Sequence, residues 1–486
     1  MKRVYHILFM VLLVPGLAVA QENQGSQTFT LDQCVQYALD NSINIKNAVL
    51  DEEIADARVK ETRGIGLPQI EASVGLLHNQ KLPRFFAQYY APQNGEESFI
   101  DLSGVPGIQD GDVLAMQNFF QLRSSGNAAL NINQILFNGS YLVGLKAANA
   151  YRALSIKSTR QSKEQTMQQV TKAFYGVLIN KDRMNLFDNN IARVDSLLKT
   201  TQALNKNGFA EGIDVDRIQV TLNNLIAERD KFYNLQELTL HLLKFQMNYP
   251  LDQPLDVSGD IASLDVDESL LKNYELDWDY TQRSDYQLLE ANRNLQNLDV
   301  RNKFSAALPS LSAFANLGYS TQSPDIGGLF TTHSNHIEDN GSYGPDKWYS
   351  YSSFGVNLNI PIFSGLQRSY RLQQAKINLM KIENNFTSLK SAIDLEVKQA
   401  AISYLNAIKS LESQRANSKL AENIARITKI KYEQGVGSNL EVIDAEASLK
   451  ESQINYYNAL YDALIAKVDL DKAYGKMLPA ENEETK

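Results

Sequence analysis

The stretch from Leu366 to Gln434 contains neither proline nor glycine, and this feature most restricts the fold of the 486-residue chain. A second stretch, from Ser140 to Lys206, has no proline and only two glycines. Because proline and glycine are the residues that most often break helices, each stretch is predicted to be one helix. A helix of about 67 residues is about 100 Å long. Helices of this length cannot fold back into a small globule.

Each long helix is followed by a turn and a second helix. Gly208 and Gly435 lie in these turns, and glycine is favoured just beyond helix C-termini because it adopts a left-handed conformation at little cost. After the turns, mostly apolar residues recur at steps of three and four over 218–235 and 443–468. This spacing is typical of helices that pack lengthwise against a partner. We therefore expect two long antiparallel helical hairpins.

Three blocks of sequence occur twice in the same order, which indicates an internal duplication. The pairs are LPQIEASVGL (67–76) with LPSLSAFANL (308–317), NINQILFNG (131–139) with NLNIPIFSG (357–365), and GFAEGIDVDRIQVTL (208–222) with GVGSNLEVIDAEASL (435–449). The two halves are therefore expected to share one architecture, with a longer insertion in the first half.

Two segments in each half alternate between apolar and polar residues, as β-strands with one apolar face do. In FGVNLNIPI (354–362), every second residue is apolar; in its copy, Gln134 interrupts the apolar face. The predicted strands lie near 68–78, 126–137, 309–320 and 349–363. Long loops rich in glycine and proline, at 80–125 and 321–347, join the strands of each pair. Loops of such length are functional or flexible.

The N-terminus, MKRVYHILFMVLLVPGLAVAQ, has a basic start, a short apolar run and a small-residue cleavage site at Ala18–Ala20. These are the parts of a secretory signal peptide. An uncleaved anchor is the alternative, although the apolar run is short for a membrane span. No later apolar run approaches 18 residues, so no transmembrane helix is expected.

Charge and cysteine content limit the function classes. The net charge of −9 argues against nucleic-acid binding. The single cysteine, Cys34, cannot form an internal disulfide. We expect it to be a small buried residue on a helix rather than a reactive thiol.

Four strands with one apolar face are too few to close a membrane barrel, because bacterial single-chain barrels begin at eight strands. Each predicted strand is about ten residues long, the length that a tilted strand needs to cross the hydrocarbon. The chain must therefore pool its strands with copies of itself. Strand-end aromatic residues suit interfacial girdles: Tyr89, Tyr90, Phe119, Phe120, Tyr319, Trp348, Tyr349 and Tyr351.

Essentially the whole mature chain resembles the outer-membrane efflux proteins, the TolC family. The resemblance rests on the duplicated strand-plus-hairpin plan, on IPIFSG (360–365) leading into a helix, and on YEQGVGSNLEVIDAEASL (432–449). It implies a homotrimer, with twelve strands in the outer membrane and a twelve-helix barrel running about 100 Å through the periplasm. It also implies an exit duct of a tripartite efflux or type I secretion system, working with a periplasmic adaptor and an inner-membrane pump. The alternative is a periplasmic coiled-coil adaptor, which would carry one hairpin per chain.

The predicted fold class is therefore a membrane β-barrel continuous with a long α-helical barrel: mainly α, four strands per chain, two repeats, closed by homotrimerisation. The expected divisions are the signal peptide (1–20), repeat 1 (21–250), a linker (251–270), repeat 2 (271–475) and a flexible tail (476–486). The long helices are expected near 140–206, 212–248, 366–434 and 439–474. The expected location is the outer membrane, in contact with its lipid and extending into the periplasm.

Acidic residues follow the second turn. Glu441 and Asp444 are three apart and share one helix face. One interpretation is that they only complement the positive end of the helix dipole. The resemblance supplies another, in which acidic residues at matching positions form rings that line the periplasmic aperture and favour cations. Asp214 matches Glu441 across the repeat and is a weaker candidate.

The resemblance assigns roles near the aperture and at the membrane. Tyr432 corresponds to a tyrosine that helps hold the closed mouth shut, but the arginine of that network is replaced here by Gly437, and plain interhelical packing is the alternative role. The hairpin tips that would contact the adaptor contain Gly208, Gly435 and Gly437. In each half, the second predicted strand ends and the long helix begins at FNG or FSG. There, aromatic residues would lie near the inner membrane interface and glycines would permit a bend: Phe137 and Gly139, Phe363 and Gly365.

No catalytic constellation occurs in the sequence, so the chain is not expected to be an enzyme. No catalytic, cofactor-binding or metal-binding residue is predicted. The segment HSNHIED (333–339) groups two histidines with two acidic residues, but it lies in a loop and is expected to be solvated. Gly435 and Gly437 do not begin a phosphate-binding loop, because no strand precedes them and Leu440 occupies the place of the third glycine.

Overall fold

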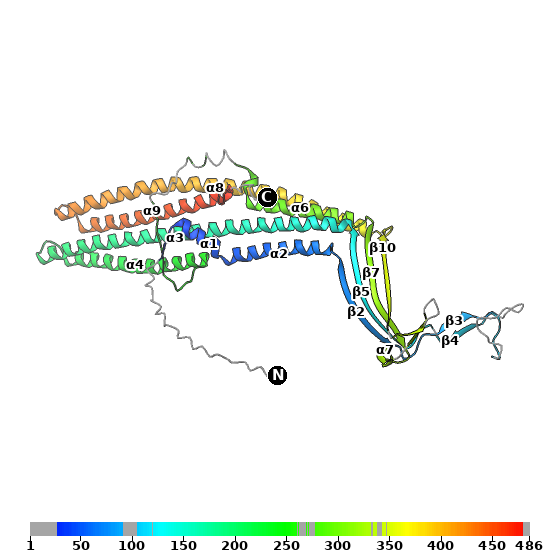
Figure 1. Cartoon of the computed structure of the whole chain (residues 1–486). Coiled ribbons are helices and arrows are strands. Elements are labelled where there is room, and N and C mark those ends of the chain that lie inside the picture. Colours follow the sequence, from blue (N-terminus) through cyan, green and yellow to red (C-terminus); the bar gives the residue numbers. More distant parts are fainter. Residues whose placement is uncertain are drawn as a thin grey trace, which may run out of the picture. The chain divides into compact units, whose positions relative to one another are not determined.

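The computed structural model describes residues 27–90, 105–118, 120–259, 261, 269, 271, 278–331, 334–337, 343–346 and 348–479. The predicted signal peptide and residues 480–486 of the predicted tail lie outside the described residues, as does part of the predicted linker. The described chain is mainly helical, with one four-stranded sheet and three two-stranded sheets (Figure 1). It divides into two compact units. Unit 1 comprises the described parts of 1–52, 155–290 and 385–486, and unit 2 comprises those of 53–154 and 291–384.

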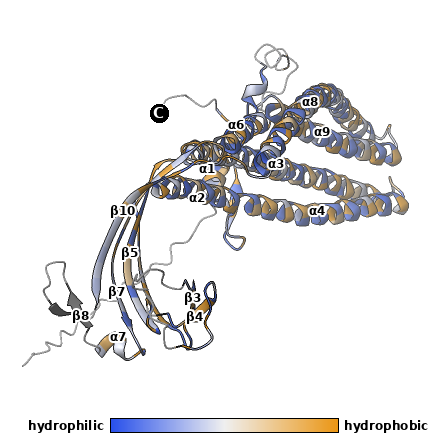
Figure 2. Ribbon diagram, turned by 90° about the vertical axis from the view of Figure 1, so that its right-hand side faces the viewer, coloured by the Kyte–Doolittle hydropathy of each residue, from blue (hydrophilic) through white to orange (hydrophobic). Residues whose placement is uncertain are grey.

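Two helical hairpins dominate unit 1. Their helices are α3 (Gly139–Lys206, 68 residues), α4 (Gly212–Met247, 36 residues), α8 (Gln367–Glu433, 67 residues) and α9 (Asn439–Ala473, 35 residues). The C-terminal parts of α3 and α8 belong to unit 1, together with all of α4 and α9. Hydrophilic and hydrophobic residues alternate along all four helices (Figure 2). The apolar residues of the four helices meet in a buried cluster near the turns.

A larger core lies elsewhere in unit 1. It joins α1 (Leu31–Asn41) to α3, α4, α8 and α9, with Tyr404, Leu243 and Leu464 among its fully buried members. The short strands β1 (Gln27–Phe29) and β6 (Leu255–Val257) pair in parallel beside it. Cys34 is buried in this core, as expected. Burial raises the pKa of its thiol to about 12, so the thiol stays protonated and unreactive at neutral pH.

A buried arginine fixes the C-terminal end of α9. Arg283 lies between the 3₁₀ turn η2 (Tyr280–Gln282) and α6 (Ser284–Ser305). Its guanidinium donates to the carbonyls of Lys472 and Ala473, each at 3.1 Å, and so satisfies backbone groups that a helix end leaves unpaired. Its charge is balanced by Asp285 at 2.8 Å and Glu396 at 2.7 Å. Burial alone would lower the pKa of Arg283, but these two carboxylates raise it.

The four-stranded antiparallel sheet lies in unit 2, with the strand order β10-β7-β5-β2 (Figure 1). The strands are β2 (Gln69–His78), β5 (Ser124–Phe137), β7 (Ser310–Ser323) and β10 (Tyr349–Asn359). The adjoining helices include α2 (Ile43–Ile65), which leads into β2, and α6, which leads into β7. β2 and β10 form the two edges of the sheet, and neither edge is paired within the described chain.

The strand register gives the sheet two different faces. One row crosses all four strands through Ile70, Ile132, Ala315 and Phe354. The neighbouring row on the opposite face crosses through Glu71, Asn131, Asn316 and Ser353. Because alternate residues of a strand point to opposite faces, one face is apolar and the other polar. The apolar side chains are largely exposed in the single chain.

β10 ends at Asn359, whereas the sequence alternation predicted a strand as far as residue 363. Pro361 cannot donate a hydrogen bond to a neighbouring strand. Gly365 and Leu366 then adopt positive φ angles of 60° and 64°, so the chain turns before α8 begins. Alternation therefore continues in the sequence for several residues after the strand has ended.

The long loops contain structure that the sequence did not predict. Two short hairpins are β3 (Phe85–Gln88) with β4 (Val113–Met116), and β8 (Ser334–Ile337) with β9 (Tyr343–Asp346). A single helical turn, α7 (Gly328–Thr331), packs against β5 and β7. Among the described helices, none is both long enough and apolar enough to cross a membrane.

Candidate functional site

The two hairpin turns of unit 1 have the same geometry. Gly208 and Gly435 adopt positive φ angles of 79° and 73°. The next residue in each turn donates its N–H back to the preceding helix: Phe209 to the Leu204 carbonyl at 2.8 Å, and Val436 to the Lys431 carbonyl at 3.0 Å. This is the capping pattern that glycine permits at helix C-termini. The positive φ angles thus favour glycine at both positions.

Gly437 has a different requirement. A Cβ atom there would lie 3.0 Å from the Tyr432 nitrogen and 3.1 Å from the Lys431 Cβ. The turn therefore brings the backbone of residue 437 against the last turn of α8, where a side chain does not fit without movement. The arginine that the family resemblance would place here would require the turn to shift slightly.

Polar contacts join the helices that start beyond the turns. The Asn439 amide donates to the Asp214 carbonyl at 3.0 Å, which ties the start of α9 to the start of α4. Asp214 accepts from the Glu211 N–H at 3.4 Å and lies 3.9 Å from Arg217. Its half-buried carboxylate therefore helps to cap α4. The neighbouring helix α9 is capped by Ser438, whose hydroxyl accepts from the Glu441 N–H at 3.2 Å.

Tyr432 lies inside the cluster where the four helices meet. Its hydroxyl is 2.9 Å from the hydroxyl of Thr201 on α3, and both residues are buried. Val194, Leu222 and Val442 are members of the same cluster. Tyr432 therefore packs between helices and also makes a hydrogen bond that joins α8 to α3. Sequence reasoning missed Thr201, since no local pattern marks it.

Glu441 and Asp444 are exposed on the first turns of α9. Neither carboxylate forms a salt bridge with another described residue of the protomer. Glu441 lies in the first turn of α9, where the helix dipole favours negative charge. Asp444 lies one turn later on the same face, so the two carboxylates form a small negative surface near the turn.

The turns also expose apolar side chains. Phe209 is 80 % exposed and Val436 is 77 % exposed, and they occupy matching positions after Gly208 and Gly435. Sequence reasoning named the glycines and overlooked these neighbours. The repeat alignment carried the signal, because it places an apolar residue after each glycine.

Two ion pairs join the helices next to the buried cluster that contains Tyr432, on its side away from the turns. The Arg193 Nε donates to Glu446 at 3.2 Å, which joins α3 to α9. The Lys450 ammonium lies 3.0 Å from Glu228, which joins α9 to α4. Both pairs are partly buried, so they fix the lengthwise position of α9 against its neighbours.

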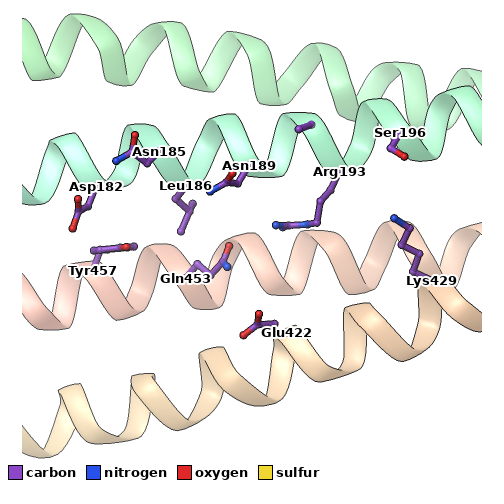
Figure 3. Close-up of a pocket in the computed structure, with 11 residues that line it drawn as sticks. Asp182, Asn185, Leu186, Asn189, Arg193, Ser196, Glu422, Lys429, Gln453 and Tyr457 are labelled. Carbon is purple, nitrogen blue, oxygen red and sulfur yellow. The ribbon is translucent and has the colours of Figure 1, made fainter. Parts of the chain in front are cut away.

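A polar groove opens beside these ion pairs, between α3, α8 and α9 (Figure 3). Its volume is about 680 Å³. Charged side chains of both signs line it, with Asp182 and Arg193 from α3, and Glu422 and Lys429 from α8. Such a surface suits a polar protein segment better than an apolar small molecule.

The two strand-to-helix junctions lie in unit 2 and are built differently. At the first, the Asn138 side chain accepts from the Tyr141 N–H at 3.0 Å and caps α3. A Cβ on Gly139 would lie 3.2 Å from the Ser305 carbonyl, so glycine is needed for close packing against the end of α6. Phe137 is exposed at the end of β5.

At the second junction, Gly365 supplies the positive φ described above, so here the glycine does permit a bend. Arg368 of α8 donates to the Pro361 carbonyl at 3.0 Å and steadies the irregular segment. Phe363 is largely exposed there. The shared motif therefore serves the same place in each half through different local contacts.

Within the described residues, no group of three or more histidine, cysteine or acidic side chains is arranged to hold a metal ion. The side chains of the histidine-containing segment 333–339 lie outside the described residues.

Residues 281–476 of the chain match the protein family described as "Outer membrane efflux protein". Among curated proteins, the chain is 23 % identical over 467 residues to the probable efflux pump outer membrane protein TtgC of Pseudomonas putida, covering 94 % of this chain and 86 % of that protein. It is 20 % identical over 361 residues to the outer membrane protein TolC of Vibrio cholerae, covering 72 % and 77 % of the two chains.

By these matches the chain is similar to the outer-membrane efflux proteins of the TolC type. Solved structures agree on the fold. The Campylobacter jejuni CmeC outer membrane channel superposes with a TM-score of 0.65 at 16 % identity, covering 99 % of this chain and 96 % of that one. The Neisseria gonorrhoeae MtrE outer membrane channel gives 0.66 at 18 % identity, covering 92 % and 88 %. The matched proteins are named as outer-membrane proteins or channels.

Proposed function

We propose that the chain is the outer-membrane exit duct of a tripartite efflux or type I secretion system. The observation that carries this function is the sheet of unit 2, which has one apolar face, one polar face and two unpaired edges. Such a sheet is incomplete as a soluble element, because its apolar face and its edges both need partners. Outer-membrane lipid would cover the apolar face, and copies of the chain would pair with the edges.

The strand directions suit closure by copies. The order β10-β7-β5-β2 is antiparallel throughout, so the two edge strands run in opposite directions. β2 of one copy can therefore pair antiparallel with β10 of the next. A homotrimer closes a barrel of twelve strands, within the range of outer-membrane barrels. Its lumen would be lined by the polar row through Glu71, Asn131, Asn316 and Ser353.

Exposed apolar side chains along unit 1 support the same assembly. On α4 they recur at helical spacing, and on α8 a second stripe does the same: Leu235, Leu238, Leu242 and Phe245; Leu420, Ile424, Ile427 and Ile430. Stripes of this spacing are typical of helices that pack against a partner. We infer that each stripe packs against a helix of a neighbouring copy, which closes the helical barrel.

The hairpin tips are the proposed contact with a periplasmic adaptor. Phe209 and Val436 protrude beside Gly208 and Gly435, and Gly437 keeps the second turn narrow. In a trimer these features recur around a ring, which suits a ring of adaptor hairpins. The polar groove beside α8 offers a second contact for the adaptor. An inner-membrane pump would supply the energy.

The aperture would lie at the same end of the duct. Glu441 and Asp444, repeated in each copy, would concentrate negative charge there and favour cations. Tyr432 would hold α8 against α3 through Thr201. Asp214 would act mainly as a helix cap, since its carboxylate is occupied within the protomer.

The duplication explains the chain plan. Repeat 1 (21–250) and repeat 2 (271–475) would each contribute two strands and one hairpin to the duct, joined by the linker. The matching turn geometry at Gly208 and Gly435 supports this division, as does the order of the three repeated blocks.

The direct test is the behaviour of the purified protein. We expect a detergent-solubilised protein with the mass of three copies, and planar bilayers that acquire discrete ion conductance when it is added. A monomer that stays soluble without detergent, and that produces no conductance, would contradict the proposal.

A further inference from the structure

Along most of the sheet the side chains of the apolar face are largely exposed, but at the end away from the long helices the residues on this face are buried. Ser124 pairs with Ser323, and Gly126 pairs with Thr321. Strand alternation places these residues on the same face as Tyr319, the face that is apolar along the rest of the sheet. They are buried, whereas Tyr319 is exposed. Another element therefore covers the apolar-side face at this end.

The cover consists of α7 and Trp348. The Leu329 side chain of α7 is 1 % exposed, and its carbonyl accepts from the Trp348 indole N–H at 3.1 Å. The indole ring lies so close to the sheet that a Cβ on Gly126 would be 2.6 Å from the Trp348 Cη2. Asp325 accepts from the Gly328 N–H at 2.7 Å and fixes the start of the turn. These contacts hold α7 and Trp348 against the sheet.

The segment also carries exposed apolar side chains. Ile326 is 52 % exposed and Phe330 is 55 % exposed, and no charged residue occurs between them. Tyr319, exposed on the same face of β7, lies between the covered end and the apolar rows of the sheet. The apolar surface therefore extends past the last apolar row of the strands onto α7.

The length of the strand band explains why such an extension is useful. From Leu311 to Tyr319 the apolar face of β7 covers eight residue steps, about 27 Å along the strand. For a strand tilted by about 40°, this is about 20 Å along the membrane normal, against an apolar band of about 25 Å in outer-membrane barrels. The strand alone is a few Å short.

We propose that 324–331 together with Trp348 is an interfacial lipid anchor, in which Ile326 and Phe330 insert among the acyl chains of the outer leaflet. This inference rests on the proposed function, because it requires the apolar face to contact lipid. α7 contacts the middle strands β5 and β7, whereas a second copy would pair with the edges β2 and β10. Continuity with the lipid-facing band therefore favours lipid as the occupant.

The test uses full-length protein with Cys34→Ala and one new cysteine carrying a fluorophore, at Ile326→Cys or Phe330→Cys. Val74→Cys, in the middle of the apolar face, and Ser353→Cys, on the polar face, are the controls. The protein is reconstituted in phosphatidylcholine vesicles that contain a nitroxide lipid labelled near the headgroup or deep in the chain. Iodide serves as the aqueous quencher.

We expect the labels at 326 and 330 to be quenched several-fold more by the shallow nitroxide than the label at 353, and only weakly by iodide. The label at 74 should respond most to the deep nitroxide. If the label at 74 responds as expected while those at 326 and 330 respond to iodide, the anchor is refuted. Shielding of 326 and 330 from both quenchers would also refute it, because a protein would then cover α7. A label at 74 that no lipid quenches would instead contradict the proposed function.

Discussion

The hydrogen bond between Tyr432 and Thr201 allows a quantitative test of how the hairpin ends are held together. Tyr432→Phe removes one hydroxyl and leaves the Thr201 hydroxyl buried without the partner that it has at 2.9 Å. Leaving a buried polar group unsatisfied costs about 1–3 kcal/mol. Because about 1.4 kcal/mol corresponds to a tenfold change, separation of α8 from α3 near the turns should become roughly 5- to 150-fold more frequent.

Amide hydrogen exchange of the detergent-solubilised protein measures this change. We expect faster exchange in 196–206 and 427–436, with unchanged exchange in the sheet of unit 2. Thr201→Val should have a similar effect. The double variant Tyr432→Phe/Thr201→Val should recover most of the loss, because no hydroxyl is then left unpaired.

Thr200→Val is the matched control, since the Thr200 hydroxyl bonds within α3 to the Ser196 carbonyl. It should exchange as the parent protein does. The reasoning is refuted if Tyr432→Phe leaves exchange at the turns unchanged, or if the double variant is as labile as the sum of the single variants.

Three further predictions concern the turns and the core. Glu441→Gln/Asp444→Asn should lower the preference for cations in planar bilayers, because like charges crowd at the aperture; unchanged selectivity would leave the two acids as helix-dipole partners. Gly437→Arg should destabilise the second hairpin by about 1–3 kcal/mol through overpacking, seen as faster proteolysis at the turn, and a more resistant variant would contradict the turn geometry. Burial raises the pKa of the Glu164 carboxyl group, so the folded state favours its protonated form. This preference stabilises the protein fully below the unfolded pKa of about 4.3 and is lost as the pH rises through the raised folded pKa. Glu164→Gln should therefore raise the melting temperature at pH 7 more than at pH 4; an equal effect at both would exclude this cause.

The long helices could be predicted because residues close to their ends mark where they stop. Gly208 and Gly435 mark the turns in the sequence, and the observed helices begin and end within one or two residues of the expected limits. The end of β10 could not be foreseen in this way. The apolar alternation continues through Ile360 and Ile362, and only Pro361 hints that pairing stops earlier.

The contacts of the candidate site were less visible in the sequence. Tyr432 was recognised, but its partner Thr201 is 231 positions away and has no distinguishing neighbours. The turn α7 lies in a loop without periodicity, and its burial depends on Trp348, which follows in the chain after β8 and β9. Such features arise from tertiary contacts, which single-sequence patterns do not encode.

The central claim is that copies of the chain close one barrel by pairing β2 with β10. Its most direct test is disulfide crosslinking in outer membranes, in a Cys34→Ala background, between Ser73→Cys on β2 and cysteines scanned along 351–357 of β10. The two strands form opposite edges of the protomer sheet, so a link between them must join different copies. We predict covalent species of two and three chains and no larger. The account would be contradicted if every position in the scan remained monomeric, or if the ladder continued beyond three chains.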